Sequence, residues 1–180
     1  MLVQLTAKRS SEEASSDPLE MLLACHERIR NHLALAHRLI DAVEPAAAGV
    51  SEAASALVRY FGQALPLHIL DEDVTLLAAL AARTLEPALR LALETMTAEH
   101  LLIEPTVEEA LGIWQKLTAE PLLLATLRED LTRLTVRLRT LLSLHLEAEE
   151  RQIFPAVAKL LTAKEREAMV ERIRERRQAR

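Results

Sequence analysis

The sequence predicts an all-α fold, an antiparallel up-down four-helix bundle followed by an extra charged helix at its C-terminal end. Half of the 180 residues are hydrophobic but only 2 % are aromatic, which disfavours a strand-rich core and leaves leucine and alanine to fill the interior. Apolar residues recur at spacings of three and four along four segments, as they do on the core face of a helix. Short loops separate these segments, which is typical of a bundle whose neighbouring helices are antiparallel.

The first two helices are bounded by a proline signal and a serine cap. Asp17-Pro18 combines an N-cap residue with a proline at the first helical position, and Glu20 adds a carboxylate in the first turn. The first helix is predicted to end near Glu44-Pro45, because a residue before proline avoids the helical conformation. The second helix is predicted to start at the cap Ser51 and to end at about Arg83.

The third helix is predicted over about residues 87–117 and the fourth over about residues 122–161. Pro105 lies inside the third helix and predicts a kink there. Thr162 and Glu165 have the spacing of a capping box, which predicts a charged helix over 163–177. The chain is therefore divided into a flexible leader (1–16), the bundle (17–161) and a charged C-terminal helix (162–180).

Charge and composition exclude several classes of function. A formal net charge of −5 does not suit binding to nucleic acid or to an anionic membrane. No run of about 18 uncharged apolar residues predicts a transmembrane span, and the first residues lack the apolar core of a secretory signal. One cysteine provides no disulfide framework and suits a reducing compartment, so a cytoplasmic protein is expected.

Each of the four apolar stripes is interrupted by ionisable residues, whose burial is costly unless they are paired or bind a metal. The interruptions are His26 in the first helix, His68 and Glu72 in the second, His100 and Glu104 in the third, and His145 and Glu149 in the fourth. His26 precedes His68 by 42 residues, and His100 precedes His145 by 45. The chain therefore resembles a duplicated helical hairpin, and two facing copies would bring these residues to one site.

The residue types in this set point to a metal centre. Imidazole nitrogens with hard carboxylate oxygens suit iron, with manganese and zinc as alternatives. Ferritin-like sites use more carboxylates and a Glu-x-x-His spacing, whereas His68 and His145 each precede a glutamate by four residues. The dominance of histidine favours the binding of O₂ or a related small ligand over iron storage.

The pattern His…HxxxE…His…HxxxE, with Phe154-Pro155 after the last glutamate, resembles the hemerythrin-like HHE cation-binding domains over about residues 18–160. The resemblance implies two iron ions bridged by oxide or hydroxide, with ligands at His26, His68, Glu72, His100, His145 and Glu149. It also implies that Glu72 and Glu149 bridge the two irons. Invertebrate hemerythrins have a histidine where this chain has Glu104, which is either a seventh ligand or a departure that leaves one iron with an open position.

Residues beside the set have two interpretations. Asp71, Asp73 and Glu150 are either solvated or bond a ligand imidazole from outside. Cys25 is expected to be a small packing residue, and His32 is expected to face solvent.

The resemblance and the ligand types together predict a non-haem diiron protein that binds O₂ or NO as a sensor, carrier or scavenger. The alternative is a diiron redox enzyme or iron-handling protein, acting in peroxide or NO reduction or in iron homeostasis. The sequence contains no nucleophile–base pair, so catalysis would depend on the metals alone, and whether the protein is an enzyme is left open. The expected partner is a small diatomic molecule, with no nucleic acid and no membrane.

Overall fold

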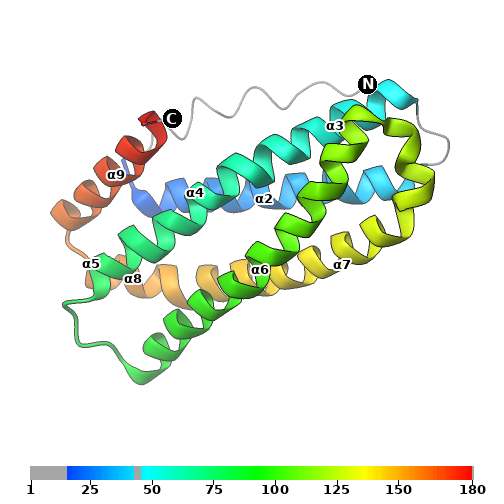
Figure 1. Ribbon diagram of the computed structural model, residues 1–180. Helices are drawn as coiled ribbons and strands as arrows, with labels where there is room; N and C mark the ends of the chain where they lie inside the picture. Colours follow the sequence, from blue (N-terminus) through cyan, green and yellow to red (C-terminus); the bar gives the residue numbers. More distant parts are fainter. Residues whose placement is uncertain (1–15, 43–45, 180) are drawn as a thin grey trace.

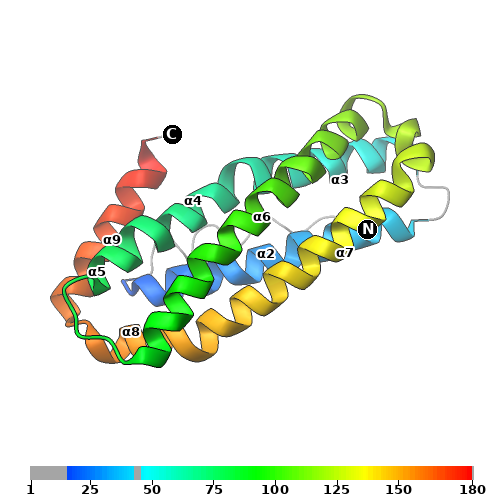
Figure 2. The ribbon, with the colours of Figure 1, turned by 60° about the horizontal axis from the view of Figure 1, so that its bottom comes forward.

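The computed structural model describes residues 16–42 and 46–179, and every secondary-structure element within these ranges is helical. Four long helical segments lie side by side, as Figure 1 and Figure 2 show. The elements in chain order are α2 (Pro18–Asp41); α3 (Ala47–Arg59), η1 (Tyr60–Ala64), α4 (Leu65–Leu70), η2 (Asp71–Leu76) and α5 (Leu77–Leu80); α6 (Pro87–Ala119); η3 (Pro121–Leu123), α7 (Leu124–Ala148), η4 (Glu149–Ile153) and α8 (Phe154–Leu160); and α9 (Ala163–Gln178). η1, η2 and η4 are π-helical turns inside otherwise α-helical segments, and η3 is a 3₁₀ turn.

Two of the predicted helix starts are confirmed. Asp17 Oδ1 accepts a hydrogen bond of 2.8 Å from the amide of Leu19 at the start of α2. Thr162 and Glu165 form a reciprocal capping box at the start of α9. The predicted leader and the predicted break at Glu44-Pro45 lie outside the described residues, apart from Ser16.

The predicted start of the second helix at Ser51 is wrong. The helix begins one turn earlier, at Ala47: Ala47 and Ala48 are good helix formers, and Val50 is buried in the larger apolar cluster. Ser51 lies inside α3, and its hydroxyl donates a hydrogen bond of 2.8 Å to the carbonyl of Thr118 near the end of α6. A tertiary contact therefore takes the side chain that a local cap would have used.

The third helix begins at Pro87 as predicted, ends two residues beyond the predicted end, and continues through Pro105. α6 continues for 33 residues to Ala119, and the hydroxyl of Thr106 donates to the carbonyl of Leu102 at 2.8 Å. None of these long helices could cross a membrane: the part of the chain that the structure describes contains no helix with a sufficiently long apolar stretch.

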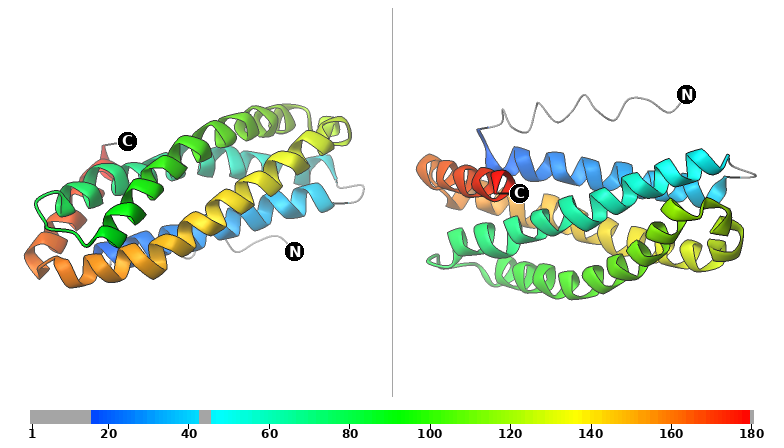
Figure 3. Two further views of the ribbon diagram at one scale, coloured as in Figure 1. Left: turned by 90° about the horizontal axis from the view of Figure 1, so that it is seen from below. Right: turned by 45° about the horizontal axis from the view of Figure 1, so that its top comes forward.

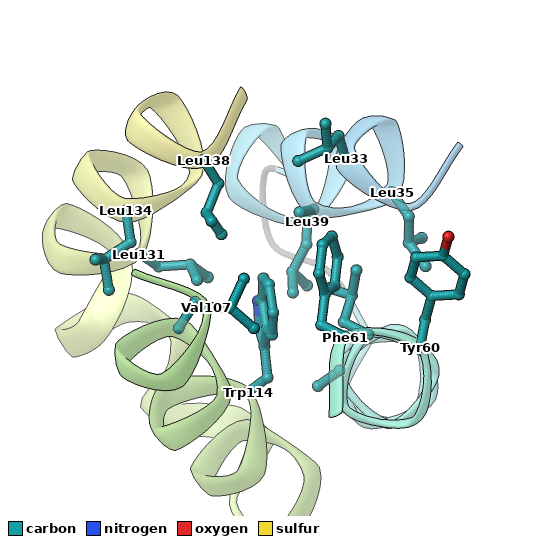
Figure 4. Packing of buried hydrophobic residues seen from close by; sticks show 14 of the residues in the cluster. Leu33, Leu35, Leu39, Tyr60, Phe61, Val107, Trp114, Leu131, Leu134 and Leu138 are labelled. Atoms are coloured by element: carbon teal, nitrogen blue, oxygen red, sulfur yellow. The ribbon is translucent and has the colours of Figure 1, made fainter. Parts of the chain in front are cut away.

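Two apolar clusters fill the bundle on either side of the ionisable residues. The larger cluster surrounds Trp114, which is fully buried and stacks on Phe61 with ring centroids 5.1 Å apart. Figure 4 shows both rings between all four long segments. The smaller cluster lies at the other end of the bundle and includes Leu76, Met96 and Phe154. The ionisable residues are therefore placed between two regions that exclude water.

The larger cluster generates a test of the fold. Leu131 is fully buried on α7, whereas Leu122 is 83 % exposed two residues before α7 begins. Leu131→Ala should lower the free energy of unfolding by about 2–5 kcal/mol because it leaves a cavity. The matched change Leu122→Ala should alter it by less than about 0.5 kcal/mol. Urea denaturation followed by circular dichroism measures both, and equal effects would contradict this core.

Candidate metal centre

The ionisable interruptions of the four stripes meet inside the bundle. The structure brings together six of the predicted residues, which are His26, His68, Glu72, His100, His145 and Glu149. Each of these residues is at most 2 % exposed. They form two groups of four that share both glutamates, and within each group the candidate ligand atoms lie within 4.8 Å of one another. We call these six residues the ligand layer.

The two oxygens of Glu72 face different histidines. Oε1 lies 3.2 Å from Nε2 of His68 and 3.8 Å from Nε2 of His26. Oε2 lies 3.4 Å from Nε2 of His100. One oxygen of Glu72 is therefore directed at the His26–His68 pair and the other at the His100–His145 pair.

Glu149 divides its oxygens in the same way. Its Oε2 lies 3.1 Å from Nε2 of His26, and its Oε1 lies 3.2 Å from Nε2 of His145. Nε2 of His145 in turn lies 3.1 Å from Nε2 of His100. Both glutamates therefore stand between two histidine pairs, as carboxylates that join two cations would.

Both glutamates are carried by π-helical turns. Glu72 is the second residue of η2 and Glu149 is the first residue of η4. A π turn adds an extra residue to the helical circuit, and such turns are frequent at functional sites. The two HxxxE segments therefore share a local backbone feature as well as a sequence motif.

The ligand layer has the properties of a metal site. Several of its buried polar atoms make no hydrogen bond, and these are Nε2 of His26, both ring nitrogens of His68, and both carboxylate oxygens of Glu72 and of Glu149. Burying such atoms without a partner is unfavourable, so they call for a further group between them. Imidazole nitrogens and carboxylate oxygens together are a donor set that first-row transition metals accept. The residues present fit bound metal cations.

Three of the four histidines are oriented by carboxylates on the outer side of the ligand layer. The Nδ1 atoms of His26, His100 and His145 lie 2.8, 3.0 and 2.9 Å from Glu150, Asp73 and Glu99, respectively. A carboxylate at Nδ1 accepts its proton and leaves the Nε2 lone pair directed inward, which favours metal binding. The sequence interpretation of Asp73 and Glu150 as outer partners of ligand imidazoles is consistent with these contacts.

Sequence reasoning missed Glu99. It precedes His100 directly, and it bonds His145 on the neighbouring segment rather than its own neighbour. The corresponding position in the first repeat is Cys25, which precedes His26. Nδ1 of His68 makes no hydrogen bond, so the two halves of the ligand layer differ in their outer contacts.

Glu104 does not join the ligand layer, so the structure does not support it as a seventh ligand. Its side chain is exposed, and it lies outside both four-residue groups. Ile103 and Val107 occupy the inward side of α6 at this height. Glu104 is rotated by about 100° from Ile103 and therefore faces outward.

Two neighbouring expectations are also corrected. Asp71 is fully buried rather than solvated, and it bonds Arg176 and Arg177 instead of an imidazole. His32 is half-buried rather than solvent-facing, and its ring stacks on that of Tyr60 with centroids 3.7 Å apart. Both partners come from other helices, so spacing along one helix could not identify them.

The close carboxylates raise the proton affinity of two histidines. Burial by itself lowers the pKa of His26, but Glu149 and Glu72 outweigh it and raise the pKa from 6.5 to about 9. Burial is likewise outweighed at His100, where Glu72 and Asp73 raise the pKa to about 9. Without cations, both imidazoles therefore hold a proton more tightly than a free imidazole does.

The pKa values of His68, Glu72 and Glu149 are shifted as well. Burial lowers the pKa of His68 to about 3, so this imidazole is neutral. Burial by itself raises the pKa of Glu72, but the surrounding histidines outweigh this effect and hold the pKa of the carboxyl well below its ordinary range. Burial and the negative charge of Glu72 raise the pKa of Glu149. Protons therefore stabilise the metal-free layer, and a bound metal has to displace them.

A hollow of about 250 Å³ leads to the ligand layer between α6 and the α7–η4 segment. Much of its wall is apolar, formed by Leu91, Ala92, Met96 and Ile153, and its lining includes His145 and Glu149. Thr95, Glu99 and Gln152 add polar groups to the lining, and the hollow is large enough for a small molecule.

The raised histidine pKa values predict that metal binding strengthens with pH. Between about 6.5 and about 9, the ligand layer must release protons from His26 and His100 before their Nε2 atoms can bind. The same protons stabilise the metal-free fold below pH 6.5, and this contribution is lost as pH rises through about 9. Zinc titrations against a competing chelator should show tighter binding at higher pH, while the metal-free melting temperature falls. Affinity that does not change with pH would contradict the assignment.

The outer contact of His145 predicts a second effect. Glu99→Gln removes the charge that orients this imidazole and should weaken metal binding by about 10–100-fold. Glu94→Gln is the matched control, because Glu94 is exposed on the same helix. Equal affinities of the two variants, measured by the same titration, would show that Glu99 does not support the ligand.

A comparison with known proteins agrees with this geometry. No curated protein sequence and no solved structure was found to match the chain at a significant level. The sequence profile of the family Hemerythrin HHE cation binding domain matches residues 17–157, which include the whole ligand layer. The match covers most of the chain, and the chain therefore belongs to the hemerythrin HHE cation-binding family.

Proposed function

We propose that the protein is a non-haem diiron protein that binds O₂ or NO, as a sensor, carrier or scavenger, in an antiparallel up-down four-helix bundle. The observation that carries the proposal is the division of the carboxylate oxygens. Glu72 and Glu149 each direct one oxygen toward the His26–His68 pair and the other toward the His100–His145 pair. Such an arrangement suits two cations that share both carboxylates.

The charge of the ligand layer favours two divalent cations with room for a further ligand. Two carboxylates against two divalent ions leave positive charge that a small ligand can offset. Iron is the proposed metal because histidine-rich sets with carboxylates suit it, and manganese and zinc are the alternatives. When bound, a pair of irons would supply reversible binding of a small diatomic molecule.

This chain's own residues would keep the centre dry and hold the ligand imidazoles in place. The two apolar clusters cover the ligand layer on both sides along the bundle axis. Glu150, Asp73 and Glu99 hold the Nδ1 protons of three imidazoles on the outer side. The hollow between α6 and η4, about 250 Å³ in volume, would admit a small molecule to His145 and Glu149. The cytoplasmic location and the absence of nucleic-acid and membrane partners stay predictions.

The proposal is tested by metal content and an optical spectrum with and without O₂. Protein loaded with iron(II) anaerobically should contain about two irons and should gain charge-transfer absorption in the near ultraviolet on exposure to O₂ or NO. Reversal of this absorption when the gas is removed supports carriage or sensing. Many turnovers with an added reductant would instead support the alternative, a redox enzyme. A protein that takes up no iron would contradict both.

Substitution of the shared carboxylates gives the sharpest prediction at the level of residues. Glu72→Gln and Glu149→Gln keep the side-chain size but remove an anion that both cations need, so each variant should lose the two-metal centre. Each variant is expected to retain at most one metal ion, bound by the remaining histidines. Glu104→Gln is the matched control and should keep the full iron content, because Glu104 is exposed. Iron stoichiometry after identical loading measures all three, and greater loss in the control would contradict the shared roles.

The hollow predicts a separate effect on ligand access. Ala92→Phe places a ring in its wall and should slow the association of NO, with iron content unchanged. Ala98→Phe adds the same bulk at an exposed position of α6 and should leave the rate unchanged. Stopped-flow absorption measures the rates. Equal rates in the two variants would show that ligands reach the centre by another route.

A further inference from the structure

The C-terminal helix α9 lies beside the π turn that carries Glu72, and it is outside the region that the family profile covers. The profile ends at residue 157, whereas α9 spans Ala163–Gln178. Figure 1 and Figure 3 show α9 beside the start of α2 and the end of the α3–α5 segment. It contacts α2 and η2, the π turn that carries Glu72.

Two arginines of α9 bond a buried carboxylate next to Glu72. Asp71 is fully buried, and Arg176 and Arg177 each donate to one of its oxygens, the latter at 3.2 Å. Arg176 also donates to the hydroxyl of Thr75 at 3.0 Å, so it holds η2 at two points. A buried carboxylate that loses its cationic partners is strongly unfavourable, so these two arginines stabilise η2 in the position that the structure shows.

Apolar packing and surface ion pairs add to these contacts between α9 and the bundle. Met169, Val170 and Ile173 are its buried apolar residues. Two ion pairs near its start, Arg83 with Glu165 and Arg166 with Asp17, are partly exposed and contribute little.

We propose that docking of α9 and metal binding are coupled through η2, with Arg176, Arg177 and Asp71 as positioning residues for Glu72. The coupling rests on the proposed function only in that the cations bind at Glu72. Docked α9 holds η2 in the conformation that directs Glu72 inward, and a cation at Glu72 holds the η2 conformation that α9 binds. The effect is reciprocal, because two events that favour one conformation strengthen each other by the same factor. Metal occupancy is thereby transmitted to a helix on the surface.

Cys25 provides a reporter of this docking. It is the one cysteine of the sequence and is 4 % exposed. Its Sγ lies 3.4 Å from Nη2 of Arg177 and 3.0 Å from Nη2 of Arg28. Release of α9 removes Arg177 and should expose the thiol to reagents.

The experiment follows α9 directly and compares the metal-free protein with the protein loaded with iron(II) anaerobically. Loading should slow hydrogen exchange over residues 163–178 and the reaction of Cys25 with N-ethylmaleimide, each by about 5–150-fold, the usual range of such coupling. In the loaded protein, Arg176→Gln should speed hydrogen exchange in α9 and the reaction of Cys25. It should also weaken iron affinity by the same factor by which iron loading slows these two reactions in the wild type. Arg172→Gln is the matched control and should behave like the wild type, because Arg172 is exposed on the same helix.

A second variant covers the case in which Arg176→Gln leaves an unpaired charge that unfolds the protein. Asp71→Asn removes that charge, and adding Arg176→Gln to it should change iron affinity little further, because both act through one contact. Additive effects would overturn the coupling, as would equal protection of α9 by iron in the wild type and in Arg176→Gln. A wild type that binds iron without slowing exchange in α9 overturns the coupling alone. A wild type that binds no iron overturns the proposed function as well.

Discussion

The structure depends on one constraint, which is that four imidazoles and two carboxylates are buried with their metal-binding atoms facing one another. Nε2 of His26 and the oxygens of Glu72 and Glu149 have no hydrogen-bond partner, and the apolar clusters on both sides offer them none. Such a layer is unfavourable by itself, and protons stabilise it only in part. A bound cation satisfies the orphaned atoms, so metal binding and folding are linked.

The two repeats of the helical hairpin account for the near symmetry of the ligand layer. The repeats differ in the residues that surround the ligands. Each repeat supplies a histidine, an HxxxE pair and a π turn, and the acidic residue after each glutamate bonds the histidine of another segment. Glu99 and Cys25 occupy corresponding positions but differ in chemistry, and His68 has no outer carboxylate. Both imidazoles of the His100–His145 pair therefore have a carboxylate at Nδ1, whereas only one imidazole of the His26–His68 pair does.

Different structural elements lie beside the two repeats of the ligand layer. The hollow beside α6 and η4 opens on His145 and Glu149, while α9 covers the opposite repeat beside Cys25 and Asp71. The hollow thus adjoins the second repeat of the ligand layer, and α9 adjoins the first.

The sequence by itself determined the helical class, the bundle and six residues of the candidate site. Heptad-like spacing reveals which face of a helix is buried, and a histidine or glutamate on that face is conspicuous because its burial needs a reason. The same logic identified the caps at Asp17 and Thr162, where the signal is local.

Only the tertiary structure decided the rest, because those features depend on contacts between helices. Ser51 bonds α6 instead of capping its own helix, and Glu99 orients a histidine of another segment. Glu104 satisfies the spacing of a ligand but faces outward, since the inward direction of α6 is set by its neighbours. Spacing along one helix defines a face to within a fraction of a turn, and the packing of several helices determines which atoms on that face meet.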